Sequence, residues 1–173
     1  MNDSSIDQDL TQIALQEERL QFDTFTADTA WQLGTLLKET VEARGKAVAI
    51  DIQLFGQPLF FYAMPGTTPD NIDWIRRKRN VVERFQQSSY AVRLTLKKKQ
   101  TTLTDQAGLS LRDHAAAGGG FPIRLRGSAC IGAITISGVP MREDHGIIVE
   151  VLAKWLNQPI SELALPPADD MDD

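Results

Sequence analysis

The sequence predicts an α+β domain in which a mainly antiparallel β-sheet is flanked by helices. Three observations support this class. Some segments alternate apolar and polar residues with period two, which indicates strands, and others repeat apolar residues at helical spacing. Their order is helix, helix, strand, strand, helical excursion, strand, strand, helix, and grouped strands and helices of this kind are typical of α+β domains.

Two helices are expected first. Ser5 is a suitable N-cap for a helix that continues to about Phe22. Thr26 or Asp28 can cap the second helix, and Gly45 suits the left-handed conformation that commonly ends one. The apolar faces of the two helices are Ile6, Leu10, Ile13, Ala14 and Leu20, and then Ala30, Leu33, Leu37 and Val41.

A strand pair should follow. Residues 48–54 alternate, with Val48, Ile50, Ile52 and Leu54 on one face. A turn at Gly56-Gln57 leads into the apolar run 59–64. Because both faces of this second run are apolar, we expect it to be a central strand that is covered on each side.

The next segment predicts a helix that begins at Asp70 or Asn71, after a break rich in proline and glycine. Its apolar stripe contains Trp74, Lys78, Val81, Val82 and Phe85, while Arg76, Arg77, Arg79, Asn80 and Arg84 lie off the stripe. Ser88-Ser89 is a break or a new cap. Residues 90–99 alternate like a strand, yet they also continue a helical region, so both interpretations stand at this point.

The remainder predicts a connection, a hairpin and a final helix. Residues 101–117 form a long connection with one short helical turn, and such loops are often functional. Residues 121–126 and 129–136 should pair across Gly127-Ser128. Glu143 and Asp144 lie in the first turn of the last helix, where exposed amides stabilise acids. We therefore expect an N-terminal acidic helix (1–25), a single α+β domain (26–160) and an acidic flexible tail (161–173).

Composition narrows the class of protein. With 173 residues, 42% hydrophobic, the chain is long enough for one well-buried core. A single cysteine, Cys130, excludes an internal disulfide and a cysteine-based zinc site. No apolar run approaches the length of a membrane span, and the polar start lacks the layout of a signal peptide. The sequence thus predicts a cytoplasmic protein with no membrane partner.

Charge is distributed unevenly. The net charge is −5, but residues 1–30 carry −6 and residues 162–173 carry −5, which leaves +6 on the middle of the chain. Acidic ends on a basic middle indicate a surface that attracts anions. The alternative is that surface charges are simply distributed unevenly. We expect a small anionic ligand here, and no nucleic acid.

Several motifs resemble one known family. They are Gly118-Gly119-Gly120-Phe121-Pro122-Ile123, the turn Ser137-Gly138-Val139-Pro140, the helix start Glu143-Asp144-His145, and the earlier segment 74–80 with Ser88-Ser89. Over roughly residues 26–156 the chain resembles the UPF0303-like cytosolic proteins related to HbpS and GlcG, which are named for heme degradation. The resemblance implies a profilin-like three-layer fold, a helix at residues 90–99, homo-oligomers, and heme as a ligand.

The glycine run is the first candidate binding element. Three residues without Cβ let backbone amides approach a ligand closely and adopt positive φ. The run is not a nucleotide loop, because Phe121-Pro122 opens a strand and no Gly-Lys-Ser/Thr follows. The alternative is a strained entry into the hairpin.

His114, His145, Arg76, Arg77 and Arg79 complete the predicted ligand-binding set with Gly118, Gly119 and Gly120. Arginine forks suit carboxylates and phosphates, although such a run can also be a solvated face. A metal site of His145 with Glu143 or Asp144 has weak spacing, so no metal is expected. No nucleophile elbow is present, and a catalytic constellation is not evident.

Three functions remain open. The first is a binding module for a small anion, with heme as the ligand that the resemblance names. The second is a homo-oligomeric scaffold for protein partners. The third, a heme-degrading enzyme, has the least support, because Cys130 is followed by Ile131 and only His, Tyr or Met could ligate iron.

Overall fold

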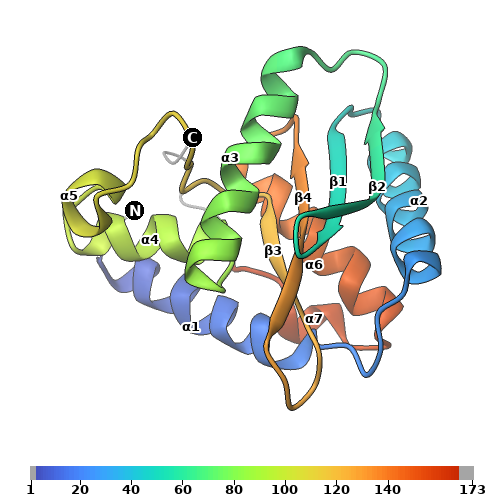
Figure 1. Cartoon of the computed structure of the whole chain (residues 1–173). Coiled ribbons are helices and arrows are strands. Elements are labelled where there is room, and N and C mark those ends of the chain that lie inside the picture. Colours follow the sequence, from blue (N-terminus) through green and yellow to red (C-terminus); the bar gives the residue numbers. More distant parts are fainter. Residues whose placement is uncertain (1–2, 168–173) are drawn as a thin grey trace.

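A four-stranded antiparallel sheet forms the middle of the protein. The computed structural model describes residues 3–167. Its strands run in the order β2-β1-β4-β3 (Figure 1). Their bounds are Ala49–Leu54 for β1, Gln57–Ala63 for β2, Gly120–Arg124 for β3 and Cys130–Ser137 for β4. The central pair is β1 and β4, which come from distant parts of the chain.

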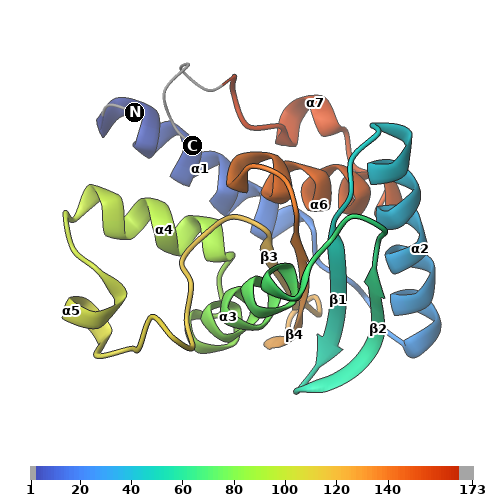
Figure 2. The same ribbon diagram turned by 90° about the horizontal axis from the view of Figure 1, so that it is seen from above.

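Helices cover both faces of this sheet. Their bounds are α1 Asp3–Arg19, α2 Ala27–Ala43, α3 Pro69–Phe85, α4 Ser89–Lys98, α5 Leu103–Ala107, α6 Met141–Trp155 and α7 Ile160–Leu163. Helix α3 packs on one face, and α2 and α6 pack on the other (Figure 2). Helix α1 lies against α4 and α7. The predicted three-layer α+β fold is confirmed.

Local signals position α2 and α4 as expected, whereas Ser5 lies inside α1 and α3 begins at Pro69, before the expected Asp70 or Asn71. Thr26 and Thr29 form a capping box at the start of α2, and Gly45 follows its end with φ of 65°. The Asn71 side chain accepts a hydrogen bond from the Thr68 amide at 2.8 Å and so caps α3. The Ser88 hydroxyl accepts one from the Ala91 amide and begins α4. Each cap satisfies an amide that the helix itself leaves unpaired.

Residues 89–98 form helix α4, which confirms the helix that the resemblance favoured. The alternation has a physical cause, because residues two apart lie on nearly opposite sides of a helix. Tyr90 and Leu94 pack toward α1, whereas Val92 and Leu96 pack toward Val81 of α3. A helix buried on both sides therefore shows the same period as a strand.

Strand β2 is an edge strand, so the prediction of a central position was wrong. It pairs only with β1 among the described strands, and most of its residues are exposed. Phe61 and Tyr62 remain 51% and 39% exposed. Helix α3 covers β4, β3 and β1 but leaves β2 open on that side. Both faces of the run are apolar, but within the described residues only the face toward α2 is covered by a helix.

The C-terminal part departs from the expected tail beginning at residue 161. Residues 160–163 form α7, and the Leu163 side chain is completely buried in the core. Its carbonyl accepts a hydrogen bond from Gln16 of α1 at 2.6 Å, and the Pro166 carbonyl accepts one from Arg142 of α6. The order of the chain past 157 therefore comes from contacts with α1 and α6. Residues 168–173 lie outside the described part.

Candidate functional site

The glycine run passes through a narrow gap between the end of β4 and the start of α6. A Cβ on Gly118 would overlap the carbonyl of Met141, and one on Gly119 would lie 2.5 Å from the Ile136 carbonyl oxygen. Gly119 also has φ of +109°, a conformation that side chains rarely adopt. The glycines therefore allow close packing of backbone on backbone. This geometry matches the interpretation of the run as a strained entry into the hairpin.

A cleft opens beside this gap. Its volume is about 310 Å³, and it lies between the first turns of α3, the residue before the glycines and the turn that leads from β4 into α6. It is lined by Asp70, Asn71, Trp74, Lys78, Ala117, Ser137, Gly138, Val139, Met141 and Asp144. The size falls at the lower end of the range for small-molecule pockets.

Lys78 and Asp144 form a buried ion pair in the wall of this cleft. The Lys78 Nζ atom donates to Asp144 Oδ2 at 2.8 Å and to the Ile136 carbonyl at 3.1 Å. The two side chains are only 3% and 2% exposed. Asp144 Oδ1 accepts a hydrogen bond from the Val139 amide at 3.4 Å. The pair thus joins α3, the end of β4 and the start of α6.

Burial opposes charge on both partners. It lowers the pKa of Lys78 from its ordinary value, and the nearby Asp144 carboxylate only partly offsets this effect. Burial raises the pKa of Asp144 to about 6, with Lys78 again opposing the shift. Desolvation penalises the charged form of either group, so burial weakens the preference of the pair for its ionised form.

The three predicted arginines are engaged elsewhere. Arg76 contacts Asp73 and Asp113, each at 3.0 Å, and donates to the Arg112 carbonyl. Arg77 pairs with Asp73 and stacks over the ring of Trp74 at 4.1 Å. Arg79 pairs with the buried Asp51 of β1 at 2.6 Å. None of the three lines the cleft, so the expected free cationic surface is not present there.

The two histidines are not brought together and do not line the cleft. His145 is fully buried on the side of α6 that faces α1, where its Nε2 lies 2.8 Å from Gln16 Oε1. His114 is half-buried in the connection before β3, with Nδ1 at 3.3 Å from the Ser110 carbonyl. Their positions in the sequence predicted that both would lie near the glycine run. In the structure, the His145 ring contacts Gln16 and the His114 ring contacts the Ser110 carbonyl.

Lys78 and Asp144 are the residues that the predicted set missed. A lysine on the apolar stripe of a helix was the available signal, because lysine is almost never fully buried without a partner. Asp144 was attributed to the helix start alone. Its carboxylate does accept a backbone hydrogen bond at the helix start, but from the Val139 amide, which precedes the N-cap Pro140.

The arrangement of side chains also shows whether the described residues could hold a metal ion or heme iron. Within residues 3–167, no group of three His, Cys, Asp or Glu side chains could hold a metal ion. The residues that line the cleft include no His, Cys or Tyr, and Met141 is their single sulfur ligand. The cleft therefore does not fit heme ligated by histidine, cysteine or tyrosine. In the same described range, no helix is long and apolar enough to cross a membrane.

Fold and cleft together define a small, single-sheet α+β domain with a side-chain-lined cleft next to the start of its last long helix. The chain belongs to the HbpS-like family, described as haem degrading protein HbpS-like, which matches residues 25–153. This confirms the resemblance noted from the glycine, turn and helix-start motifs.

Individual relatives support the same assignment. A UPF0303 protein of Azotobacter vinelandii is 56% identical over 161 residues, which is 93% of this chain and 97% of the relative. The crystal structure of Ybr137w protein is 33% identical, with a TM-score of 0.79 over 86% of this chain and 87% of that one. The PduOC:heme complex is 17% identical, with a TM-score of 0.65 over 75% and 94% of the two chains. This last likeness concerns the fold alone.

Proposed function

We propose that this protein binds a small molecule in the cleft between α3 and the start of α6. The observation that supports this most is the buried Lys78–Asp144 pair, which lies in the wall of the cleft instead of deep in the apolar core. Ionisable groups whose pKa values are shifted by burial and by a charged neighbour, and that face a cleft, are typical of functional sites.

The lining argues for a ligand without strong negative charge. Asp70 and Asp144 contribute two carboxylates, and Lys78 contributes the single cation of the lining. Arg76 and Arg79, which were expected to attract an anion, are neutralised by carboxylates outside the cleft. Ser137 and Asn71 add a hydroxyl and an amide. A compact polar molecule with hydrogen-bonding groups matches this lining better than heme does.

Matched tryptophan variants test the location. Compounds of metabolite size would be screened by thermal shift on the wild type, on Trp74→Ala and on Trp31→Ala. Trp74 lines the cleft, whereas Trp31 lies on α2 and is 64% exposed. A ligand of the cleft should stabilise the wild type and Trp31→Ala but lose its effect on Trp74→Ala. A screen without binders, or binders that tolerate Trp74→Ala fully, would refute the proposal.

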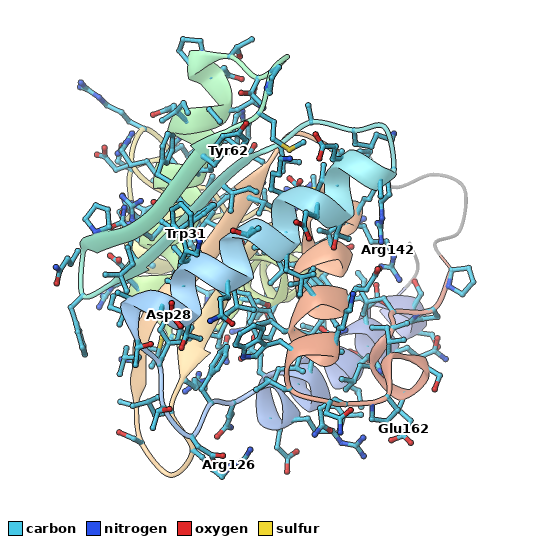
Figure 3. The ribbon with its side chains drawn as sticks, turned by 90° about the vertical axis from the view of Figure 1, so that its right-hand side faces the viewer. Asp28, Trp31, Tyr62, Arg126, Arg142 and Glu162 are labelled. Atoms are coloured by element: carbon cyan, nitrogen blue, oxygen red, sulfur yellow. The ribbon has the colours of Figure 1, made fainter. Side chains whose placement is uncertain are left out.

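A second function, self-assembly into a homo-oligomeric scaffold, is favoured by strand β2. Edge strands resist pairing through charges, prolines or bulges. In β2, Pro58 and the irregular register protect the first residues, but residues 60–63 carry none of these devices. Figure 3 shows Tyr62 of β2 and Trp31 of α2 on one face, where Trp31 also contacts Phe60 edge to face. The free backbone groups of an edge strand are best satisfied by another strand, and a second β2 is self-complementary.

Light scattering tests this second function. The wild type should be larger than a monomer at micromolar concentration, and Tyr62→Lys should reduce its size, since an edge lysine opposes strand pairing. Phe55→Lys is the control, because Phe55 is 82% exposed at the tip of the β1–β2 hairpin and outside both strands. A monomeric wild type would exclude this function.

A further inference from the structure

We propose that Lys78 is a carbonyl-capturing amine, which condenses with a small aldehyde or ketone held in the cleft to form a Schiff base. The inference rests on the proposed function, because it names the class of ligand for the same cleft. Lysines in desolvated sites are the ones that proteins use for this chemistry.

The surroundings of Nζ leave one direction of approach. Two of its three hydrogens are accepted by the Ile136 carbonyl and by Asp144 Oδ2. On the side of the glycine run the space is closed, since even a Cβ on Gly119 would lie 2.7 Å from Nζ. The remaining side belongs to the cleft, and Lys78 is the single amine among the residues that line it.

Asp144 is placed to carry every proton that the condensation moves. Lys78 first transfers a proton to the Asp144 carboxylate at 2.8 Å, which leaves a neutral amine. The amine nitrogen attacks the carbonyl carbon, and protonated Asp144 gives its proton to the carbonyl oxygen, which becomes a hydroxyl. The Asp144 carboxylate then takes a proton from the attacking nitrogen, which has become positively charged. Asp144 then protonates this hydroxyl, which departs as water. The product is an iminium ion beside the Asp144 carboxylate, so charge and atoms balance and no oxidant is required.

The same pair supports this chemistry energetically. Burial already lowers the pKa of Lys78 and raises that of Asp144. The neutral pair therefore lies closer in free energy to the ionised pair than it would for the same two groups in water. Each unit by which the pKa falls increases the free amine about tenfold at a given pH. The nearby Ser137 and Asn71 offer hydrogen bonds to an oxygen of the captured carbonyl compound.

Reductive trapping tests the inference on the intact wild-type protein. Butanal would be added near pH 7, followed by sodium borohydride, and the modified lysines would be mapped by peptide mass spectrometry. We expect the Lys78 peptide to carry the butyl group at a clearly higher initial rate than the peptides of the exposed Lys46 and Lys99, because its lowered pKa leaves more of its amine uncharged. The exposed lysines are internal controls, so the result does not depend on a variant that folds.

Two variants separate the roles of the pair. Lys78→Arg should remove the labelled position while Lys46 and Lys99 react as before. Asp144→Asn keeps the amine but loses the proton carrier, so labelling of Lys78 should slow and lose its dependence on pH around 6. Equal labelling of all lysines, or an unlabelled Lys78, would overturn the inference. The proposed cleft function would survive that result if ligands found in the thermal screen still distinguish Trp74→Ala from Trp31→Ala.

Discussion

Gln16 and His145 determine each other's hydrogen-bonding state across the contact between α1 and α6. Gln16 donates its Nε2 hydrogen to the Leu163 carbonyl at 2.6 Å, which turns its Oε1 toward the imidazole. His145 Nε2 lies 2.8 Å from that oxygen and must therefore carry a hydrogen. The ring lies beside Tyr90 and Phe121 and is fully buried, and burial lowers the pKa of His145 to about 3.

The first prediction is a loss of stability in acid that depends on His145. The unfolded chain protonates this histidine near pH 6.5, whereas the folded chain does not until about pH 3. Since the unfolded state binds more protons in this window, the free energy of unfolding must fall as the pH falls from 6.5. At pH 4 the loss from this residue should be about 3 kcal/mol.

Urea denaturation of the wild type and His145→Gln at several pH values measures this effect. Glutamine can still donate to Gln16 but does not titrate, so the difference between the two proteins should change in the predicted direction between pH 6.5 and 4. Asp144 acts oppositely, because a raised pKa makes the folded state retain its proton and stability rises in acid. Parallel pH profiles for wild type and His145→Gln would contradict the prediction.

The second prediction concerns the cost of breaking the Lys78–Asp144 pair. Lys78→Met leaves a buried carboxylate without its partner, so unfolding should become easier by about 3–5 kcal/mol at neutral pH. The double variant Lys78→Met with Asp144→Asn should recover most of this loss, since an amide can still accept from the Val139 amide. A double variant as unstable as the single one would mean that packing, and not charge, dominates.

The third prediction compares two glycines with positive φ. Gly119→Ala adds a Cβ that meets backbone and should cost about 3–5 kcal/mol, as the sum of conformational strain and overpacking. Gly127→Ala, in the β3–β4 turn, has φ of +71° but open space around it, so it should cost about 1 kcal/mol. Chemical denaturation of both variants gives the comparison. Equal costs would show that the gap around Gly119 relaxes easily.

The fourth prediction is that Arg76 of α3 restrains the connection before β3. Its contacts with Asp113 and the Arg112 carbonyl hold that connection against α3. Arg76→Ala should therefore accelerate tryptic cleavage after Arg112, while global stability changes by no more than about 1 kcal/mol, as for other exposed ion pairs. Arg93→Ala, at an exposed position on α4, is the control. If both variants are cleaved at the wild-type rate, Arg76 does not restrain the connection.

The elements that local rules govern could be predicted from sequence. Helix α2 has both its cap at Thr26 and its stop at Gly45 where the residue types indicate them. The β3–β4 hairpin follows from alternation on either side of Gly127. These features depend on neighbours within a few residues, so a single sequence contains the information.

Features that depend on distant partners could not be predicted in this way. The basic run at residues 76–79 suggested a free cationic surface because Asp51 and Asp113, which neutralise it, lie far away in sequence. The continuous apolar run in β2 shows two apolar faces but does not say whether another element covers each of them. His145 stands next to two acids in sequence, yet its hydrogen-bond partner, Gln16, is 129 residues away.

The contact of α1 with the end of the chain also constrains the order in which the protein can form during synthesis. Helix α1 is made long before Arg142 and Leu163, to which Asp9 and Gln16 bind. Ile6 and Ile13 therefore have only α4 to cover them while the chain grows. Because domains with many contacts between distant residues close slowly, α1 should acquire its native surroundings only after α6 and α7 are made, and it should stay accessible to chaperones until then.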